Sequence, residues 1–316
     1  MVPFSVSSSE TPRRVSPGQL QALLSVYQQD SLTGLVYLTS TGNKQETVVL
    51  FYVNGQLLCL YQCQADGYIR HEAQARNAVL PKSEMDLQSF RVEAHFIRPL
   101  QGIFENAKSD AGKTISTPSV PGAIQELEKS PEPLLAHFRW PSADGFSLIP
   151  GNGLASRQFM FWSQDQVSSI PNFSRWPEPE CTLTTYHSNA ESRAWRENYM
   201  VLGFDFLYEN IFKRYDELVG ANMVARLEDQ LNSISRTQGW QIGFYAQRLQ
   251  DTQFFASMSD MRIAYRTLLL AGQRHISGVV GEKLFEQSIV LAAGSLPSVL
   301  RATLQSENIL SSPTRP

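Results

Sequence analysis

The chain has 316 residues, with 27 Lys and Arg against 30 Asp and Glu, so its formal net charge is −3. Hydrophobic residues make up 42% and charged residues 18%, which is typical of a globular chain of about two domains. These values exclude a collagen-like or wholly disordered chain. The balanced charge also argues against nucleic acid as a partner.

The N-terminal segment begins with a predicted helix and a predicted hairpin. Ser16 is a good helix cap, and Pro17 and Gln19 suit the first turn, so we expect a helix from here to about residue 28. Runs rich in Val, Leu, Tyr and Phe then predict strands at residues 35–38, 47–53 and 56–62. Asn54 and Gly55 separate the last two runs and favour a two-residue hairpin turn, because both residues tolerate a positive φ.

Two further elements complete the predicted N-terminal module. A second helix is expected at residues 68–79, and apolar residues that alternate with polar ones predict a strand at residues 90–97. Residues 1–104 are therefore expected to form one α+β module. The polar residues 105–133 have the composition of a linker, with a short helix at about residues 123–129.

Residues 134–195 combine many aromatic residues with many prolines, and we expect an irregular segment with short strands around residues 135–140 and 157–162. Exposed aromatic residues often anchor a protein partner. The candidate partner-binding residues are Phe159, Phe161, Trp162, Phe173 and Trp176. The alternative is that these side chains pin the segment onto the helical bundle.

Residues 196–310 predict a helical bundle. Apolar residues recur every three or four positions from Phe204 to Ile234, which is typical of amphipathic helices that Gly220 divides. A brief extended piece is expected around residues 240–244, and further helices after residue 259, at residues 276–292 and at residues 298–309. The tail, residues 311–316, is expected to fray. The sequence thus predicts the α+β class, with an N-terminal helix and antiparallel meander, an irregular middle segment and an all-α C-terminal bundle.

No motif in the sequence indicates a catalytic or metal site. The fragment Gly112-Lys113-Thr114 lacks the earlier glycine and the buried strand of a phosphate-binding loop. The five histidines do not share a helical face, and no Gly-x-Ser-x-Gly elbow is present. Carboxylates on the long helix, such as Asp205 and Glu209, are expected on its solvated face. We therefore predict a protein that is not an enzyme, with no catalytic residues, no metal and no cofactor.

The cysteines and the hydropathy pattern point to the cytoplasm. The three cysteines, Cys59, Cys63 and Cys181, are sparse and odd in number, which favours buried thiols in a reducing compartment. The N-terminus lacks the apolar stretch of a secretory signal, and no apolar run has the length of a membrane span. We expect no membrane association.

Residues 17–97 resemble the PatA-like N-terminal domain of bacterial signalling proteins. The resemblance is carried by the amphipathic helix, by the strand entry Leu32-Thr33-Gly34-Leu35-Val36, and by the Asn-Gly-type hairpin over residues 50–58. It implies an interaction module of a regulatory system, a kind of domain for which no catalytic residues are established. The receiver domain that often accompanies this module is not found in the sequence.

Three hypotheses for function follow. The first is a non-enzymatic cytoplasmic regulatory or adaptor protein of a bacterial signalling system, which acts through protein-protein contacts and can form a homodimer through its helical bundle. The second is a small-ligand sensor with a pocket between bundle helices, lined by Phe204, Tyr208, Tyr265 and Phe285. The third is an enzyme whose site is assembled from residues that are distant in the sequence.

Overall fold

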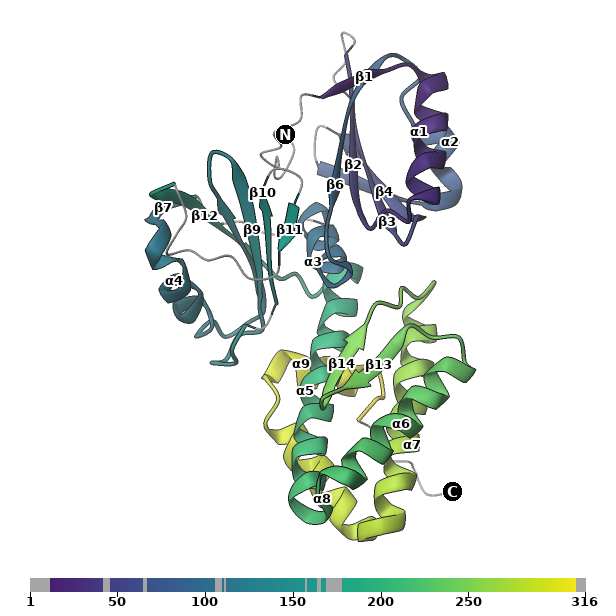
Figure 1. Cartoon of the computed structure of the whole chain (residues 1–316), viewed down its shortest axis with the longest axis vertical. Coiled ribbons are helices and arrows are strands. Elements are labelled where there is room, and N and C mark those ends of the chain that lie inside the picture. The colour runs from purple at the N-terminus through teal and green to yellow at the C-terminus, as the bar shows by residue number, and fades with distance from the viewer. Residues whose placement is uncertain are drawn as a thin grey trace. The chain divides into compact units, whose positions relative to one another are not determined.

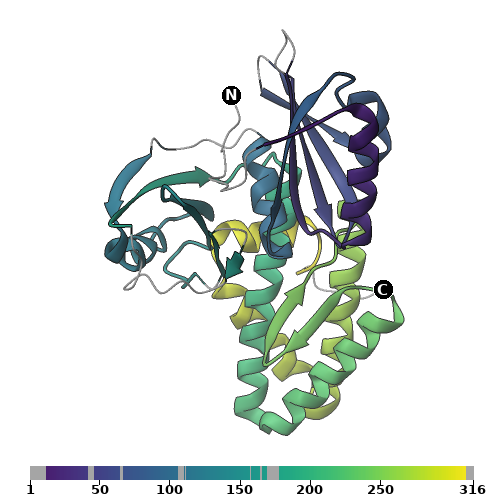
Figure 2. The same cartoon turned by 45° about the horizontal axis from the view of Figure 1, so that its top comes forward.

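The computed structural model describes residues 12–41, 46–64, 67–105, 110, 112–156, 158–163, 166–168 and 178–310. The chain divides into two compact units, residues 1–195 and residues 196–316, which we call the first and the second unit (Figures 1 and 2). Antiparallel sheets dominate the first unit and helices dominate the second. The predicted α+β class is confirmed.

The first sheet of the first unit is an antiparallel meander with a helix on each face. Its strands are β1 (Arg13–Val15), β2 (Gly34–Ser40), β3 (Thr47–Val53), β4 (Gln56–Gln64), β5 (Gly67–Glu72) and β6 (Met85–Arg91), in the order β1-β6-β2-β3-β4-β5. Helix α1 (Pro17–Gln29) buries Leu20 and Leu24 against one face. Helix α3 (Ala94–Phe104) covers the other face, where the ring of Phe104 contacts Phe51 and Tyr61.

Local signals in the sequence fix the start of α1 and the β3–β4 turn as predicted. Ser16 caps α1 and Gln19 bonds back to the Ser16 N–H at 2.9 Å, so both halves of a capping box are present. Asn54 and Gly55 have φ values of 49° and 77°, as a hairpin turn of this kind requires. The predicted strands at residues 35–38, 47–53 and 56–62 are confirmed as β2, β3 and β4.

Two expectations in this module are wrong. Residues 68–79 are not one helix: β5 runs to Glu72, and only a short turn of 3₁₀ helix (Ala73–Ala75) and α2 (Arg76–Val79) follow. Pairing of β5 with the outer edge of β4 overrides the local pattern there. Residues 90–97 are not one strand either, because β6 ends at Arg91 and α3 begins at Ala94.

The middle segment forms a second six-stranded antiparallel sheet rather than the irregular structure expected. Its strands are β7 (Lys113–Ser116), β8 (Leu134–Arg139), β9 (Ala143–Ile149), β10 (Gln158–Ser163), β11 (Gln166–Ser168) and β12 (Glu180–His187), in the order β11-β10-β9-β8-β12-β7. Helix α4 (Val120–Leu127), with a 3₁₀ turn before it (Thr117–Ser119), packs on one face. Residues 113–127 therefore belong to this sheet and its covering helix and are not a linker. The strands expected near residues 135–140 and 157–162 are confirmed.

The helices of the second unit are confirmed, with one boundary changed. They are α5 (Arg193–Val219), α6 (Ala221–Thr237), α7 (Met258–Val280), α8 (Glu282–Gly294) and α9 (Ser298–Ser306). Gly220 separates α5 from α6 with a φ of 84°, as expected. The segment 276–292 is broken at Gly281, whose φ of 92° ends α7 and begins α8. The brief extended piece near residue 242 is β13 (Ile242–Tyr245), which pairs with β14 (Arg248–Asp251).

The β3–β4 turn generates a test of the first sheet. In Gly55→Ala the new Cβ would lie 2.3 Å from the Gln28 carbonyl oxygen, at a residue with positive φ. We expect the free energy of unfolding to fall by about 2 kcal/mol or more. In the control Gly18→Ala the Cβ meets nothing within 4 Å and the residue lies in α1, so stability should be unchanged or rise by up to about 1 kcal/mol. If urea denaturation shows the same change in the free energy of unfolding for both variants, the turn geometry is contradicted.

A partly buried histidine at the start of α3 predicts a pH dependence of stability. Burial lowers the pKa of His95 from 6.5 to about 4, and the facing carboxylate is Glu93, whose Oε2 lies 3.5 Å from His95 Nε2. The unfolded chain therefore binds more protons between these pH values, so stability falls as the pH drops from about 6.5 to about 4. Because the side chain is 29% exposed, solvent screens part of the cost.

The measurement is urea denaturation at several pH values between 7 and 4. We expect His95 to account for at most about 2 kcal/mol of the loss of stability over this range. His95→Gln should flatten that part of the stability profile, since the side chain no longer takes up a proton. A variant profile that runs parallel to the wild-type profile would exclude His95 as the titrating group.

Candidate functional site

The candidate site lies in the second unit, on the hairpin formed by β13 and β14. The two strands are joined by Ala246 and Gln247, both with positive φ (49° and 64°), which gives a tight two-residue turn. The Thr252 N–H donates to the Gln241 carbonyl. The backbone hydrogen bonds across the hairpin therefore join residues 241 and 252, residues 243 and 250, and residues 245 and 248. The backbone groups of Ile242 and Phe244 consequently point away from β14.

One face of the hairpin is part of the core of the second unit. Ile242 and Phe244 are buried, and the ring of Phe244 contacts the rings of Tyr208 and Phe212 on α5. On β14, Asp251 accepts a hydrogen bond from the Tyr265 hydroxyl of α7. Because side chains alternate along a strand, the residues between these positions face outward.

Two side chains close the outer edges of the hairpin. The Asn232 carboxamide of α6 bonds to the backbone of Phe244 in both directions: Oδ1 accepts from the N–H at 2.7 Å and Nδ2 donates to the carbonyl at 2.9 Å. On the other edge, Asp205 of α5 accepts from the Leu249 N–H and from the Arg248 guanidinium. Each side chain bonds as a neighbouring strand would, so the hairpin is fixed on both sides.

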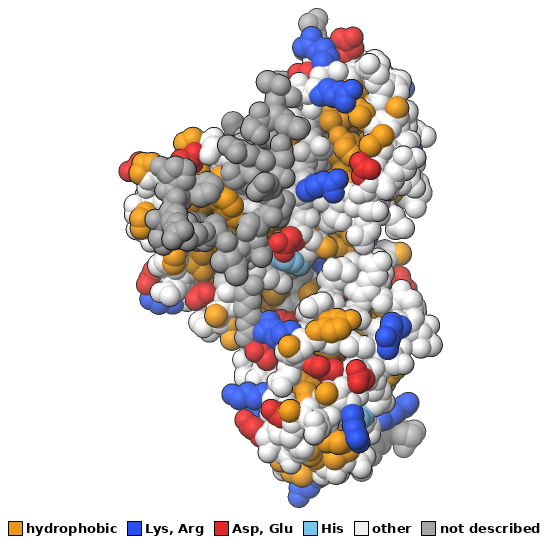
Figure 3. Space-filling model, viewed as in Figure 1, with side chains coloured by type: hydrophobic (Ala, Val, Ile, Leu, Met, Phe, Trp, Pro, Cys, Tyr) orange, Lys and Arg blue, Asp and Glu red, His pale blue; other side chains and the backbone are white. Residues whose placement is uncertain are grey.

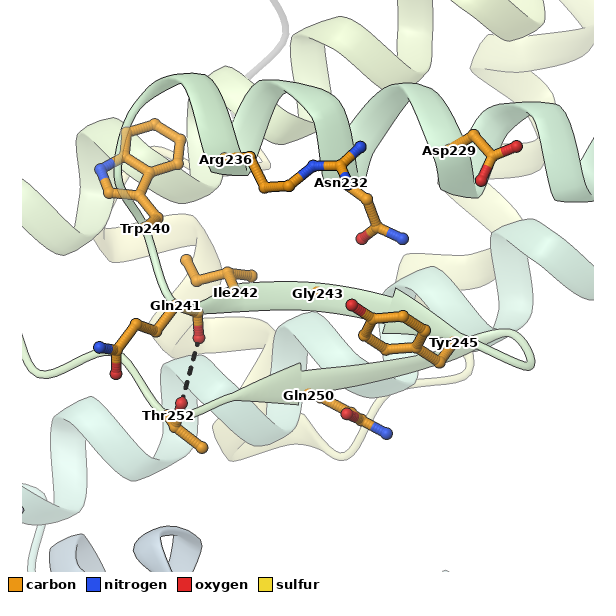
Figure 4. Close-up of a pocket in the computed structure, with 10 residues that line it drawn as sticks. All are labelled: Asp229, Asn232, Arg236, Trp240, Gln241, Ile242, Gly243, Tyr245, Gln250 and Thr252. Atoms are coloured by element: carbon orange, nitrogen blue, oxygen red, sulfur yellow. Dashed lines mark hydrogen bonds between the residues drawn. The ribbon is translucent and has the colours of Figure 1, made fainter. Parts of the chain in front are cut away.

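A hollow of about 390 Å³ lies over the outer face of the hairpin (Figure 4). Gly243 forms part of its floor, and the Tyr245 ring lies over this glycine, since a Cβ there would be 2.5 Å from Tyr245 Cε2. Figure 4 shows α6 along one side and Trp240 at one end. The residues that line the hollow are Asp229, Asn232, Arg236, Trp240, Gln241, Ile242, Gly243, Tyr245, Gln250 and Thr252.

The hollow has a basic end and an acidic end. Asp229, Asn232 and Arg236 follow one another on a single face of α6, at spacings of three and four residues. Asp229 and Arg236 are thus two turns apart, about 10 Å along the helix axis. Arg236 lies nearer Trp240 and Asp229 lies nearer Tyr245 (Figure 4). Neither charge is in an ion pair with any residue of the described ranges.

The sequence only partly predicted these residues. Trp240, Ile242 and Phe244 were expected to be extended; Ile242 and Phe244 lie in β13, and Trp240 precedes the strand. The polar strand β14 and the role of Asn232 were missed, because neither has a local signal: β14 is held by Asp205, which is 44 residues away from Leu249. The Asp229 to Arg236 spacing could have been recognised as one face of the predicted helix.

The four aromatic side chains expected to line a ligand pocket are core residues instead. The rings of Phe204 and Tyr265 stack with centroids 4.3 Å apart, and the Tyr208 hydroxyl donates to the Leu268 carbonyl. Phe285 is likewise buried. These side chains occupy the space that a ligand would need, and the hollow described above lies on the opposite face of the hairpin.

The expected partner-binding aromatic cluster is not an exposed anchor at the positions that can be described. Phe159 and Phe161 pack in the core of the second sheet, under α4, and Phe161 contacts the Trp140 ring. Trp162 lies in β10, where it pairs with Val167. Phe173 and Trp176 lie outside the described residues. The alternative, that these side chains pin the segment onto the helical bundle, does not describe Phe159 and Phe161, because both pack within the core of their own sheet.

A second candidate surface is the outer face of α8. Leu284, Val290 and Leu291 are 43%, 68% and 52% exposed, whereas Phe285 and Ala292 of the same helix are buried. At 100° per residue, the three exposed side chains span about 120° of the helix surface, outside the sector of the buried pair. Figure 3 shows hydrophobic side chains gathered at the end of the second unit that carries α8.

The polar clusters of the first unit stabilise its fold. His137 and Asp144 bond at 2.5 Å on the second sheet and are 2% and 0% exposed, so solvent and substrate do not reach them. Glu105 accepts hydrogen bonds from Tyr61, Arg70 and Ser192, which ties the first sheet to the C-terminal end of the first unit. Burial raises the pKa of the Cys59 thiol to about 12, so this thiol is unreactive near neutral pH.

No family model matches the chain, and neither a search of curated proteins nor a search of solved structures finds a match. Within the described ranges, no group of three or more His, Cys, Asp or Glu side chains is arranged to hold a metal ion. No helix in the described part of the chain combines the length and the apolar character that a bilayer crossing requires.

The edge closure by Asn232 gives a test of the site. Asn232→Ala removes both bonds to Phe244, and we expect a loss of about 1–3 kcal/mol in the free energy of unfolding. Amide hydrogen exchange at Phe244 should also become faster. The matched control is Asn222→Ala, an exposed residue of the same helix, which should leave both quantities unchanged. Slow exchange at Phe244 in Asn232→Ala would show that another group holds this edge.

Proposed function

We propose that the protein is a non-enzymatic cytoplasmic regulatory or adaptor protein of a bacterial signalling system, and that a protein partner binds the outer face of α8. The observation that carries this proposal is the exposure of Leu284, Val290 and Leu291 on one side of a single helix. Scattered apolar side chains on a surface are ordinary, but several on one helix face are typical of a binding site.

The charge distribution along α8 supports the same surface. The charged residues of the helix, Glu282, Lys283 and Glu286, all lie in its first half. The second half, residues 289–294, contains only apolar residues and glycine. Depletion of charge around exposed aliphatic side chains is typical of the central part of a protein interface, with charged residues at the rim.

The resemblance of residues 17–97 to PatA-like domains supports the regulatory part of the proposal. Two of the elements that carry the resemblance are present: the Asn54-Gly55 hairpin in the first sheet and the capped α1 packed on it. A module of this kind acts by contact with other proteins. The first unit would then engage the signalling system while α8 engages a further partner.

The test is a double substitution on α8. Partners are cross-linked in cells and recovered on tagged wild-type protein, on Val290→Gln/Leu291→Gln, and on the control Val26→Gln. Val26 is an exposed valine of α1, 42% accessible, on a different surface. We expect recovery of at least one partner to fall about tenfold or more in the double variant only, since each buried aliphatic side chain contributes about 1.5–3 kcal/mol.

Thermal unfolding of the three proteins serves as the folding control. The substituted α8 residues are exposed, so the midpoints should agree closely. If every partner is recovered equally on all three proteins, α8 is not the binding surface and the proposal fails.

A further inference from the structure

We propose that the hollow over the β13–β14 hairpin binds a flat organic anion of about nucleotide size, with its acidic group at Arg236 and a hydrogen-bond donor of its ring at Asp229. This ligand site is separate from the α8 surface and would let the protein respond to a small molecule. The proposal rests on the charges, the aromatic side chains and the size of the hollow.

The basic end of the hollow selects an acidic group. The Arg236 guanidinium lies over the hollow in Figure 4, and it is in no ion pair with any described residue. A guanidinium presents paired N–H donors that match the oxygens of a carboxylate or phosphate. Arg236 is in the last turn of α6, so its backbone position is fixed by the helix.

The acidic end of the hollow selects a donor. Asp229 is two helical turns from Arg236 and, like it, is in no ion pair within the described ranges. An ionised carboxylate only accepts hydrogen bonds, so its partner must carry an N–H or O–H group. The ligand is therefore polar at both ends, with an anionic group and a donor separated by roughly the 10 Å between these two positions.

The part of the ligand between these ends is a planar ring. The Tyr245 ring lies over Gly243, and Tyr245 is 56% exposed, so part of the ring is accessible for stacking. Trp240 adds a second aromatic surface at the basic end. Aromatic rings stack on such surfaces at about 0.5–1.5 kcal/mol beyond the area that they bury.

The size of the hollow agrees with this ligand class. A volume of about 390 Å³ lies at the small end of the range for small-molecule sites, which runs from about 300 to 1,000 Å³. Adenosine monophosphate fits this description, because its amino group and its phosphate lie at opposite ends of the molecule. It is the probe we choose for the test.

The first experiment measures binding of adenosine monophosphate by calorimetry to the full chain and to two variants. Arg236→Gln removes the basic end of the hollow and should weaken binding about tenfold or more. Arg226→Gln is the matched control, an exposed arginine of the same helix that does not line the hollow, and it should bind as the wild type does. Adenosine, which lacks the phosphate, should bind the wild type and Arg236→Gln equally weakly.

The second experiment tests the acidic end by exchanging donor and acceptor. Inosine monophosphate carries an oxygen where adenosine monophosphate carries the amino group, so the wild type should bind it about tenfold more weakly. In Asp229→Asn the carboxamide can donate to that oxygen. The preference for adenosine monophosphate over inosine monophosphate should therefore become smaller or reverse. This change of preference is a readout that a purely structural role of Asp229 would not alter.

Three outcomes would overturn the proposal: no binding of adenosine monophosphate at millimolar concentration, equal binding to the wild type and Arg236→Gln, or equal binding of the two nucleotides to the wild type. These outcomes do not affect the α8 proposal, since none of the substituted residues lies on α8.

Discussion

A two-stranded sheet has two unpaired edges, and the second unit depends on how the edges of β13 and β14 are closed. Asn232 supplies both a donor and an acceptor to Phe244, and Asp205 accepts from Leu249 and Arg248. One side chain on each edge does what a further strand would otherwise do, and no further strand is needed. The hairpin can therefore lie between helices with one face in the core and the other exposed. The hollow with its separated charges exists because this outer face is held in place.

Predictions of the fold succeeded where the determining interactions are local. The Ser16 capping box and the Asn54-Gly55 turn each act within a few residues, and both are present as expected. The failures have two different causes. Residues 67–72 form a strand by pairing with β4, their neighbour in the sequence, and the helix expected at residues 68–79 left no place for this pairing. In contrast, β7 pairs with β12 across about 65 residues, so its polar sequence looked like a linker.

The candidate site was harder to predict than the fold, for a related reason. Aromatic residues in the sequence indicate burial or binding without distinguishing the two, and Phe161 and Tyr265 are buried because strands and helices distant in sequence cover them. Tyr245 follows the buried Phe244 on β13 and Trp240 precedes this strand, and both line the hollow because the hairpin is fixed with one face outward. The direction of that face is set by contacts with α5 and α7, which a local pattern does not contain.

Helix α7 relates the two proposed surfaces to each other. On one side its Tyr265 hydroxyl donates to Asp251 of the hairpin, and on the other it packs against α8. A ligand in the hollow would alter partner binding at α8 only if it bound two arrangements of this helix with different affinity. The coupling would then be reciprocal: if the ligand raises the affinity for the partner by some factor, the partner raises the affinity for the ligand by the same factor. The buried Tyr265–Asp251 bond joins the hairpin to α7, so in a Tyr265→Phe chain that still binds at both surfaces the coupling between ligand and partner should weaken.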